Sequence, residues 1–217
     1  MRSRHRLSID ELSPFLLPET KPGEPAAPID WQALFGNANP VEVEVGFGKG
    51  MFLLSTATAR PAVNFLGIEI VRKYALYAAT RFAIRKLANV KVAPTDARPL
   101  LRDRIPEQSV QAVHVFFPDP WWKTRHHKRR LFTPDFVADV ARILRSGGLF
   151  HVVTDVEEYF GIMRGIVAGM PIFAEVPPPA ANEPSHDLDY LTNFERKFRK
   201  EGRPIYRAAF IKREAIA

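Results

Sequence analysis

The chain has 217 residues, 46% of them hydrophobic, and it carries a net charge of +7 with a pI of about 9.8. A chain of this length can form one domain with a substantial core, and its basic balance favours an anionic partner. It has no cysteine, which excludes disulfides and thiolate metal sites. No apolar run approaches the ~18 residues of a membrane span, and no secretory signal follows the basic N-terminus, so we expect a cytoplasmic protein.

Residues 1–30 contain five prolines and show little periodicity. Such a composition is typical of a segment that buries too little apolar surface to become ordered. We therefore expect residues 1–30 to form a flexible proline-rich arm and residues 31–217 to form a single domain.

The next part of the chain alternates between strand and helix patterns. Residues 41–45, with the sequence VEVEV, alternate β-branched and acidic residues before a glycine-rich turn, which predicts a strand. The apolar segment 49–60 predicts a buried helix. A short strand at 64–70 and a longer helix at 72–87 follow, and NVKVAPTDA predicts another strand that ends near Thr95.

The alternation continues in the second half of the chain. A hydrophobic strand is expected at 110–117, before a Pro-Asp-Pro turn. Thr133 is a suitable N-cap for a helix at 134–144 with proline at its first position. The glycines at 147–148 are expected to end this helix, and LFHVVTD at 149–155 predicts the next strand.

The C-terminal part differs, because its last strand has no helix after it. Residues 190–200 predict a helix or turn, and PIYRAAFIKR at 204–213 predicts a strand. We expect this strand to enter the sheet antiparallel, beside IFAEV at 172–176. The strands that alternate with helices imply a parallel sheet covered on both faces, with right-handed crossovers.

Acidic residues stand at the end of each informative strand. They occur in EVGFGKG, IEI, TDA, FPDP and VTD, and they are Glu44, Glu69, Asp96, Asp119 and Asp155. Ligands of an open α/β sheet bind beyond the carboxyl ends of its strands. One acid alone is more simply a helix N-cap or a solvated loop residue, but acids at successive strand ends favour a binding site.

Gly46, Gly48 and Gly50 form a G-x-G-x-G turn after the first strand, which lets a ligand approach the backbone closely. The pattern alone is weak, because many strand-to-helix turns collect glycines. Its spacing differs from the G-x-G-x-x-G of dinucleotide-binding proteins, which disfavours a nicotinamide oxidoreductase.

The carboxylates suit the parts of another cofactor. Glu69 can accept hydrogen bonds from two ribose hydroxyls, and Asp96 lies where an adenine amino group can be accepted. Glu44 is placed to meet a cationic group such as an amino-acid ammonium. Adenosine, ribose and an ammonium without a phosphate cradle indicate S-adenosylmethionine rather than NAD.

The segment FFPDPWWKTRHHKRRLF, residues 116–132, places Asp119 between two prolines ahead of a basic run. Residues 123–130 contain five Lys or Arg, two His and no acid, which favours contact with a polyanion. A solvated charged face is the plain alternative. Trp121 and Trp122 can stack on an extruded base, although we expect one of them to pack under the loop.

The motifs EVGFGKG, GIEI, TDA, FFPDPWWKTRHHKRRL, VTD and TNFERKFRKEGRPIYRAAF occur in the order found in the tRNA (guanine-N7-)-methyltransferase family, which residues 40–213 resemble. The resemblance implies a Rossmann-like class I methyltransferase, an α/β fold with a mostly parallel seven-stranded sheet and an antiparallel last strand. It also implies methyl transfer from S-adenosylmethionine to N7 of a guanine in the variable loop of tRNA. The alternatives are a class I methyltransferase that acts on another RNA or on protein, and an RNA-binding module without catalysis.

The resemblance further implies a role for each site residue, with Asp119 at the reaction centre. Cofactor contacts are expected from Glu44, Gly46, Gly48, Gly50, Glu69, Asp96, Ala97 and Asp119. Contacts with the substrate guanosine are expected from Lys123, Asp155, Thr192, Asn193, Phe194 and Glu195. RNA contacts are expected from Arg125, His126, His127, Lys128, Arg129 and Arg130.

Some features qualify these expectations. Trp122, Thr124 and Asn193 depart from the residues common in the family. The segment 192–195 is equally well explained, on residue types alone, as a helix start with capping chemistry. The histidine pair at 126–127 has no third ligand at suitable spacing, so we expect no metal site. The chain is expected to act as a monomer or a homodimer.

The expected reaction places few demands on the protein. Guanine N7 carries a lone pair and no proton, so its methylation needs no general base. Most of the acceleration should come from alignment of sulfur, methyl and N7. Asp119 can stabilise the positive charge that develops on the purine, or it can hold the guanine amino group or the cofactor amine.

Overall fold

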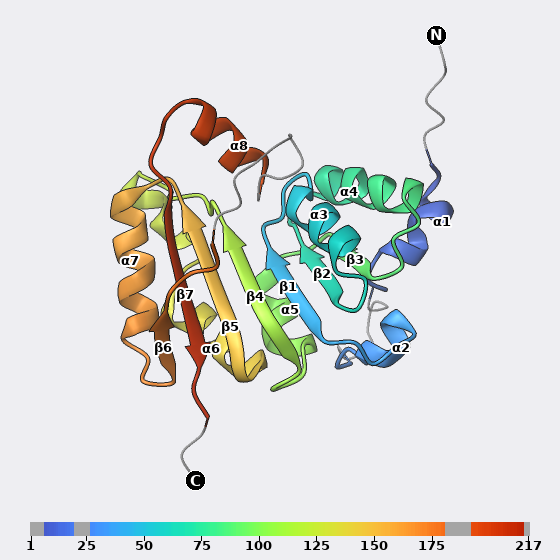
Figure 1. Ribbon diagram of the computed structural model, residues 1–217, viewed down its shortest axis with the longest axis horizontal. Coiled ribbons are helices and arrows are strands. Elements are labelled where there is room, and N and C mark those ends of the chain that lie inside the picture. The colour runs from blue at the N-terminus through green and yellow to red at the C-terminus, as the bar shows by residue number, and fades with distance from the viewer. Residues whose placement is uncertain (1–6, 20–26, 181–191, 215–217) are drawn as a thin grey trace.

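The computed structural model describes residues 7–19, 27–180 and 192–214. Its centre is a seven-stranded sheet with the strand order β3-β2-β1-β4-β5-β7-β6 (Figure 1). The strands are β1 (Val41–Val45), β2 (Asn64–Ile68), β3 (Val90–Ala93), β4 (Val110–Phe116), β5 (Leu144–Thr154), β6 (Phe173–Val176) and β7 (Tyr206–Lys212). β1 to β5 pair in parallel, and β7 runs antiparallel between β5 and β6. The prediction of an antiparallel last strand beside 172–176 is confirmed.

Helices cover both faces of this sheet. They are α1 (Ile9–Leu12), α2 (Trp31–Phe35), α3 (Met51–Ala59), α4 (Arg72–Ile84), α5 (Ala97–Arg104), α6 (Pro134–Ile143), α7 (Glu157–Ala168) and α8 (Asn193–Lys200), with the 3₁₀ turns η1 (Ser13–Phe15) and η2 (Thr124–Arg129). One apolar cluster joins the sheet to α1, α3 and α4, and a second cluster joins its other face to α5, α6 and α7. α8 lies beyond the carboxyl ends of the strands (Figure 1).

The prediction of a helix at 134–144 with Thr133 as its N-cap is confirmed, but the two glycines do not end it. Thr133 Oγ1 accepts a hydrogen bond from the Phe136 N–H at 3.2 Å, and Pro134 is the first helical residue. The expected C-terminal glycines instead lie inside β5, which begins directly after the helix at Leu144. They occupy an irregularity of the β4–β5 register, where a Cβ on Gly148 would lie 2.8 Å from the Arg145 carbonyl oxygen.

The N-terminal segment differs from the flexible arm expected at 1–30 over the residues that are described. Ser8 and Glu11 form a capping box that starts α1, and Leu12 is buried against the α3–α4 side of the sheet. Leu17 is also buried, and its N–H donates to the Val92 carbonyl at 2.8 Å. Apolar anchors and a cap therefore outweigh the prolines, and this segment covers the edge strand β3.

The structure also contains helices that the sequence patterns did not predict. α5 has proline at its third position, and α7 contains Gly161 and Gly165, so both have weak local helix signals. Each is stabilised by burial of one face, because residues such as Leu101 and Met163 pack into the core. Within the described ranges, no helix is both long and apolar enough to cross a membrane.

Candidate active site

The acids that end the strands gather at one edge of the sheet. Glu44 is the fourth residue of β1, Glu69 directly follows β2, and Asp155 directly follows β5. Asp96 and Asp119 each lie three residues beyond the ends of β3 and β4. Because β1 to β5 are parallel, these positions share the carboxyl edge of the sheet, which α8 overhangs (Figure 1).

The glycine turn between β1 and α3 is built from left-handed backbone. Gly46, Gly48 and Gly50 have φ angles of +76°, +55° and +67°. A Cβ on Gly50 would lie 2.9 Å from the Cβ of Ala78, so only glycine lets the turn pack against α4. Gly46 and Gly48 have nothing within 4 Å of an added Cβ, so the other side of the turn borders open space. A ligand can approach the backbone there.

Glu69 fixes the shape of this turn. Its Oε2 accepts the Gly48 N–H and its Oε1 accepts the Val71 N–H, both at 2.9 Å. A carboxylate has about four acceptor sites, so two are still free for the hydroxyls of a ribose. The predicted bidentate acceptor is therefore held in place by the backbone on both sides.

Asp96 has a structural role that the sequence suggested only as the alternative. Its Oδ1 caps α5 by accepting the Arg98 N–H at 3.0 Å, and the Arg98 guanidinium binds both carboxylate oxygens. Hydrogen bonds from this guanidinium lower the pKa of Asp96. Ala97, next to it, is buried as the first residue of α5. An adenine amino group at Asp96 would have to share the carboxylate with Arg98.

Glu44 is buried without compensation. The residue is 2% exposed, and its Oε2 has no hydrogen-bond partner among the described residues. Burial raises the pKa of Glu44 well above its usual value, and the neighbouring Glu69 charge raises it further. A buried carboxylate that lacks a partner is costly and points to a ligand that supplies the missing positive group.

The Pro-Asp-Pro loop presents Asp119 to solvent at this edge. The residues beside the two prolines, Phe117 and Trp121, have φ angles of +51° and +44°. Such strained conformations of large residues cluster at functional sites. Burial raises the pKa of Tyr159, and its ring lies 5.2 Å from the guanidinium of Arg130, which in turn donates to the Pro120 carbonyl of this loop. Tyr159 was not predicted from the sequence, because it reaches the loop from α7.

The basic run that follows forms η2. Arg130 Nε donates to the Pro120 carbonyl at 2.7 Å, which ties the run to the Pro-Asp-Pro loop. The Arg129 guanidinium lies 5.0 Å from the Trp121 ring, whereas Trp122 is 62% exposed. Trp121 is half-buried against His126 and Arg129 and belongs to neither apolar cluster, so the expectation that one tryptophan packs in the core under the loop is not confirmed. Exposed cations of the run are Lys123, Arg125, Lys128 and Arg129, and its half-buried residues include His126, His127 and Arg130.

The residues predicted to complete a substrate pocket come together through α8. Thr192 caps this helix by accepting the Glu195 N–H at 3.0 Å, so the capping alternative is realised. Glu195 is buried and pairs with Arg207 of β7 at 2.5 Å and with Arg199 at 3.3 Å. Phe194 is half exposed and packs on Phe198. Asn193 begins the helix, and its side chain lies outside the described part of the structure.

Asp155 is paired with Arg203, which lies between α8 and β7. Arg203 and Arg207 were not singled out from the sequence, because nothing local to GRPIYR shows that these arginines reach carboxylates on α8 and after β5. Among the described residues, no three His, Cys, Asp or Glu side chains gather as a metal site would require.

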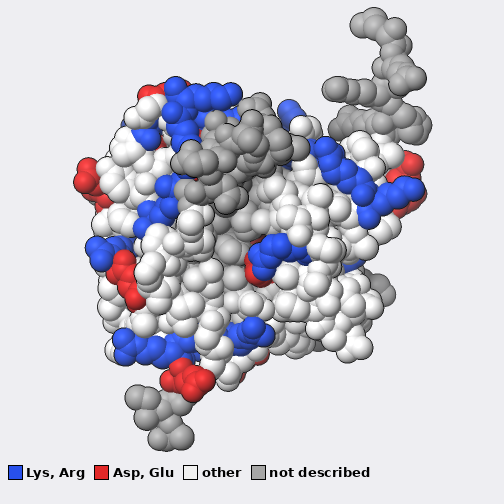
Figure 2. All heavy atoms as spheres, viewed as in Figure 1, with Lys and Arg blue, Asp and Glu red and all other residues white. Residues whose placement is uncertain are grey.

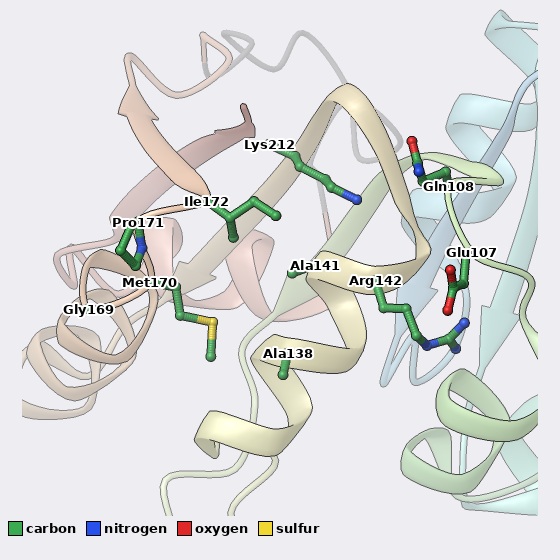
Figure 3. Close-up of a pocket in the computed structure, with 10 residues that line it drawn as sticks. All are labelled: Glu107, Gln108, Ala138, Ala141, Arg142, Gly169, Met170, Pro171, Ile172 and Lys212. Atoms are coloured by element: carbon green, nitrogen blue, oxygen red, sulfur yellow. The ribbon is translucent and has the colours of Figure 1, made fainter. Parts of the chain in front are cut away.

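A separate cleft of about 480 Å³ opens at the opposite edge of the sheet (Figure 3). Its lining includes Gln108 before β4, Arg142 at the end of α6 and Lys212 at the end of β7. Lys212 Nζ donates to the Leu144 carbonyl at 2.6 Å, and Arg142 donates to three backbone carbonyls. Lys212 thus ties β7 to the start of β5, and Arg142 ties α6 to the end of α5, away from the strand-end acids.

Known proteins resemble the chain in both sequence and structure. A family model described as "Putative methyltransferase" matches residues 38–208. The tRNA (guanine-N(7)-)-methyltransferase of Rhodopirellula baltica is 46% identical over 88% of this chain and 73% of its own length. The enzyme of the same description from Geobacter metallireducens is 36% identical over 91% of this chain and 92% of its own.

Solved structures share the fold at low sequence identity. The 16S rRNA methyltransferase KamB has a TM-score of 0.62 at 15% identity, covering 84% of this chain and 92% of its own. An S-adenosylmethionine-dependent O-methyltransferase from Thermotoga maritima has a TM-score of 0.55 at 12% identity, covering 88% of this chain and 68% of its own. These likenesses confirm the class I methyltransferase fold. The family model and the curated relatives, at 46% and 36% identity over most of the chain, show that it belongs to the tRNA (guanine-N7-)-methyltransferase family.

Proposed function

We propose that the protein transfers a methyl group from S-adenosylmethionine to N7 of a guanine in the variable loop of tRNA. The observation that carries the proposal is the buried, unpartnered Glu44 carboxylate beside the open face of the glycine turn. A cationic ligand would supply the missing partner, at the edge where Asp119 and the basic η2 segment also lie. Family membership supports the same reaction.

The residues at this edge fit the cofactor part by part. Glu44 suits the ammonium of its methionine portion, and Glu69 keeps two acceptor sites for the ribose hydroxyls. Gly46 and Gly48 leave the backbone accessible, and Ala97 adds an apolar contact near the adenine. Asp96 would bind the adenine amino group with the oxygen lone pairs that Arg98 leaves free.

For the methylation itself, the protein would align the sulfur, the methyl group and N7, and it would stabilise the positive charge that develops on the purine. The cofactor supplies an electrophilic methyl group on a sulfonium, and N7 has no proton to lose. Asp119 is exposed on a loop of fixed geometry, where its carboxylate can face the purine as positive charge develops there. The contribution of one such group to the rate is typically on the order of 10²-fold.

The guanine itself would be held below α8. Asp155 and Glu195 are acceptors that suit the N–H groups on the Watson–Crick edge of guanine. Thr192 sets the start of α8, and the exposed ring of Phe194 can stack on an unpaired base. Lys123 stands at the start of η2, where its charge can reach the neighbouring phosphate, and Asn193 would complete the pocket.

The RNA around this base would lie along η2. Its cations, from Arg125 to Arg130, would bind phosphates and give affinity without reading sequence. A class I methyltransferase that acts on another RNA or on protein is the alternative. We propose a cytoplasmic location, with the protein acting as a monomer or a homodimer.

The test is to incubate the protein with labelled S-adenosylmethionine and tRNA that lacks this modification, then to map the methyl group by cleavage at N7-methylguanine. We expect label at one variable-loop guanine, and we expect the Asp119→Ala variant to lose this transfer. Label on a different base, or transfer only to protein, would overturn the proposed substrate while keeping the fold.

A further inference from the structure

The exposed side of α4 carries a stripe of basic and aromatic residues beside the glycine turn. Residues at helical spacing along this side share one face of the helix, and they are Lys73, Tyr74, Tyr77, Arg81, Ile84 and Arg85. The opposite face, with Ala75, Ala78 and Phe82, is fully buried in the core. The stripe is therefore not needed to hold the helix in place.

The stripe is unusual in both charge and exposure. From residue 70 to residue 95 the chain contains six Lys or Arg and no acid. Tyr77 is 52% exposed and Ile84 is 67% exposed, although both are large apolar side chains. Lys73 and Arg85 form no ion pair with a described residue. Arg85 lies one turn after Arg81 and donates to its carbonyl at 3.5 Å; burial lowers the pKa of Arg81, and the Arg85 charge lowers it further. Cations that repel one another without an acid between them favour an anionic partner.

The stripe is continuous with the candidate active site. The Arg81 guanidinium donates to the Lys49 carbonyl in the glycine turn at 2.9 Å, and it lies 5.7 Å from the Tyr77 ring. Figure 2 shows a row of Lys and Arg over α4 and a second group over α8, and α8 lies beyond the carboxyl ends of the strands in Figure 1. A polyanion that crosses the strand ends can therefore touch both groups.

We propose that this face of α4 is a second tRNA-binding surface, separated from η2 by the strand ends and contacting the sugar-phosphate backbone of the same molecule. This inference rests on the proposed tRNA substrate. Exposed tyrosines interleaved with cations match nucleic acid, which offers both phosphates and base or sugar faces. A second copy of the chain fits less well, because a two-fold interface would bring this acid-free stripe against itself.

A matched pair of double variants tests the surface. Lys73→Ala/Arg85→Ala removes two exposed charges from the stripe, whereas Arg145→Ala/Arg213→Ala removes two exposed charges at the opposite edge of the sheet. The tRNA dissociation constant is measured from 50 to 300 mM salt, together with S-adenosylmethionine affinity and sedimentation. We expect the α4 variant to bind tRNA about 5- to 10-fold more weakly, with a salt slope smaller by about 1.5. The control variant should change neither quantity by more than about two-fold, and both should bind the cofactor normally.

The outcomes separate this inference from the proposed function. If wild-type protein methylates tRNA at guanine N7 but the two double variants bind tRNA alike, the α4 surface is wrong and the function stands. If wild-type protein does not methylate tRNA, the function itself fails, and the inference fails with it. If the α4 variant alone changes from dimer to monomer, the stripe is an interface between copies and the RNA contact is overturned.

Discussion

Glu42 and Glu44 lie two residues apart on β1 and are both buried on the same face of the sheet, yet only Glu42 is compensated. The Arg60 guanidinium binds both of its oxygens, and His114 Nε2 lies 3.1 Å from Oε2. Burial alone would raise the pKa of Glu42, but hydrogen bonds from His114 and Arg60 outweigh it and lower the pKa to about 2. Glu44 has its pKa shifted in the opposite direction. The Glu42 carboxylate thus stabilises the fold, whereas Oε2 of the Glu44 carboxylate has no hydrogen-bond partner among the described residues.

Because the pKa values of Glu44 and Glu42 shift in opposite directions, we expect Glu44→Gln and Glu42→Gln to change stability at pH 7 in opposite directions. Because the folded-state pKa of Glu44 lies above its ordinary value of 4.5, the folded protein holds a proton that the unfolded chain releases, and stability falls as pH rises above 4.5. Glu44→Gln should remove this loss, which has a slope of up to about 1.4 kcal/mol per pH unit. The variant should therefore unfold at higher urea than wild type at pH 7, and the two should converge near pH 4.5. It should also bind S-adenosylmethionine at least ten-fold more weakly.

Glu42→Gln is the matched control on the same strand. The folded-state pKa of Glu42 is depressed, so its contribution is present above pH 4.5 and is lost as pH falls towards 2. We expect this variant to lose about 2–3 kcal/mol at pH 7, because the buried His114 and the exposed Arg60 both lose a charged partner, and to keep its cofactor affinity. Equal loss of stability in both variants would show that Glu44 is an ordinary structural residue.

The sequence predicted the part of the site that depends on topology. Because β1 to β5 are parallel, an acid at the end of any of them must reach the same edge, so Glu69 and Asp155 could be placed together without coordinates. The antiparallel entry of β7 beside β6 was also predicted, because its strand pattern has no helix pattern after it, whereas the order of the strands comes from the structure alone.

The sequence patterns do not show which nearby groups bind one another. Asp96 was predicted as an acceptor for the adenine amino group, and in the structure Arg98, two residues away, also binds its carboxylate. Gly148 was expected to end a helix, but it lies inside β5, where a Cβ would be only 2.8 Å from the Arg145 carbonyl oxygen. Arg207 reaches Glu195 across twelve residues of chain, which no local pattern reveals. Such contacts are decided by three-dimensional proximity rather than by periodicity.

The Arg207–Glu195 pair predicts a coupling between α8 and binding of RNA. Glu195 is 4% exposed as a side chain and keeps Arg199 as a second partner, so Arg207→Ala should cost about 2 kcal/mol rather than the full penalty of an isolated charge. We expect KM for tRNA to rise several-fold while S-adenosylmethionine affinity is unchanged, with partial recovery in Arg207→Lys. Lys197→Ala removes an exposed pair with Glu201 on the same helix and should change stability by less than about 0.5 kcal/mol. A loss in Lys197→Ala as large as that in Arg207→Ala would contradict this assignment.

Arg129 predicts how η2 holds RNA. Its guanidinium lies over Trp121 and is exposed on the other side, so it can bind a phosphate without reorganisation. Arg129→Ala should weaken tRNA binding and reduce the salt slope by slightly less than one unit, with cofactor binding intact. Arg129→Lys should restore the slope but only part of the affinity, because Lys is a point charge without a planar fork. An unchanged slope in Arg129→Ala would mean that this residue does not contact phosphate.

Gly48 and Gly50 have the same backbone handedness but different surroundings, so their alanine variants should differ. A non-glycine residue at such φ angles costs about 1–2 kcal/mol, and Gly48→Ala should lose about this much because its Cβ enters open space. Gly50→Ala should lose about 3 kcal/mol, since its Cβ would also overlap Ala78 at 2.9 Å. Adding Ala78→Gly should recover part of the loss in Gly50→Ala, while in wild type the same change costs about 1 kcal/mol. Urea unfolding of the four variants measures the coupling between positions 50 and 78. If the losses of Gly50→Ala and Ala78→Gly simply add in the double variant, the glycine turn does not pack on α4 this closely. Cofactor binding separates the two glycines further, because the Cβ of Gly48→Ala occupies the side of the turn where the ligand should lie.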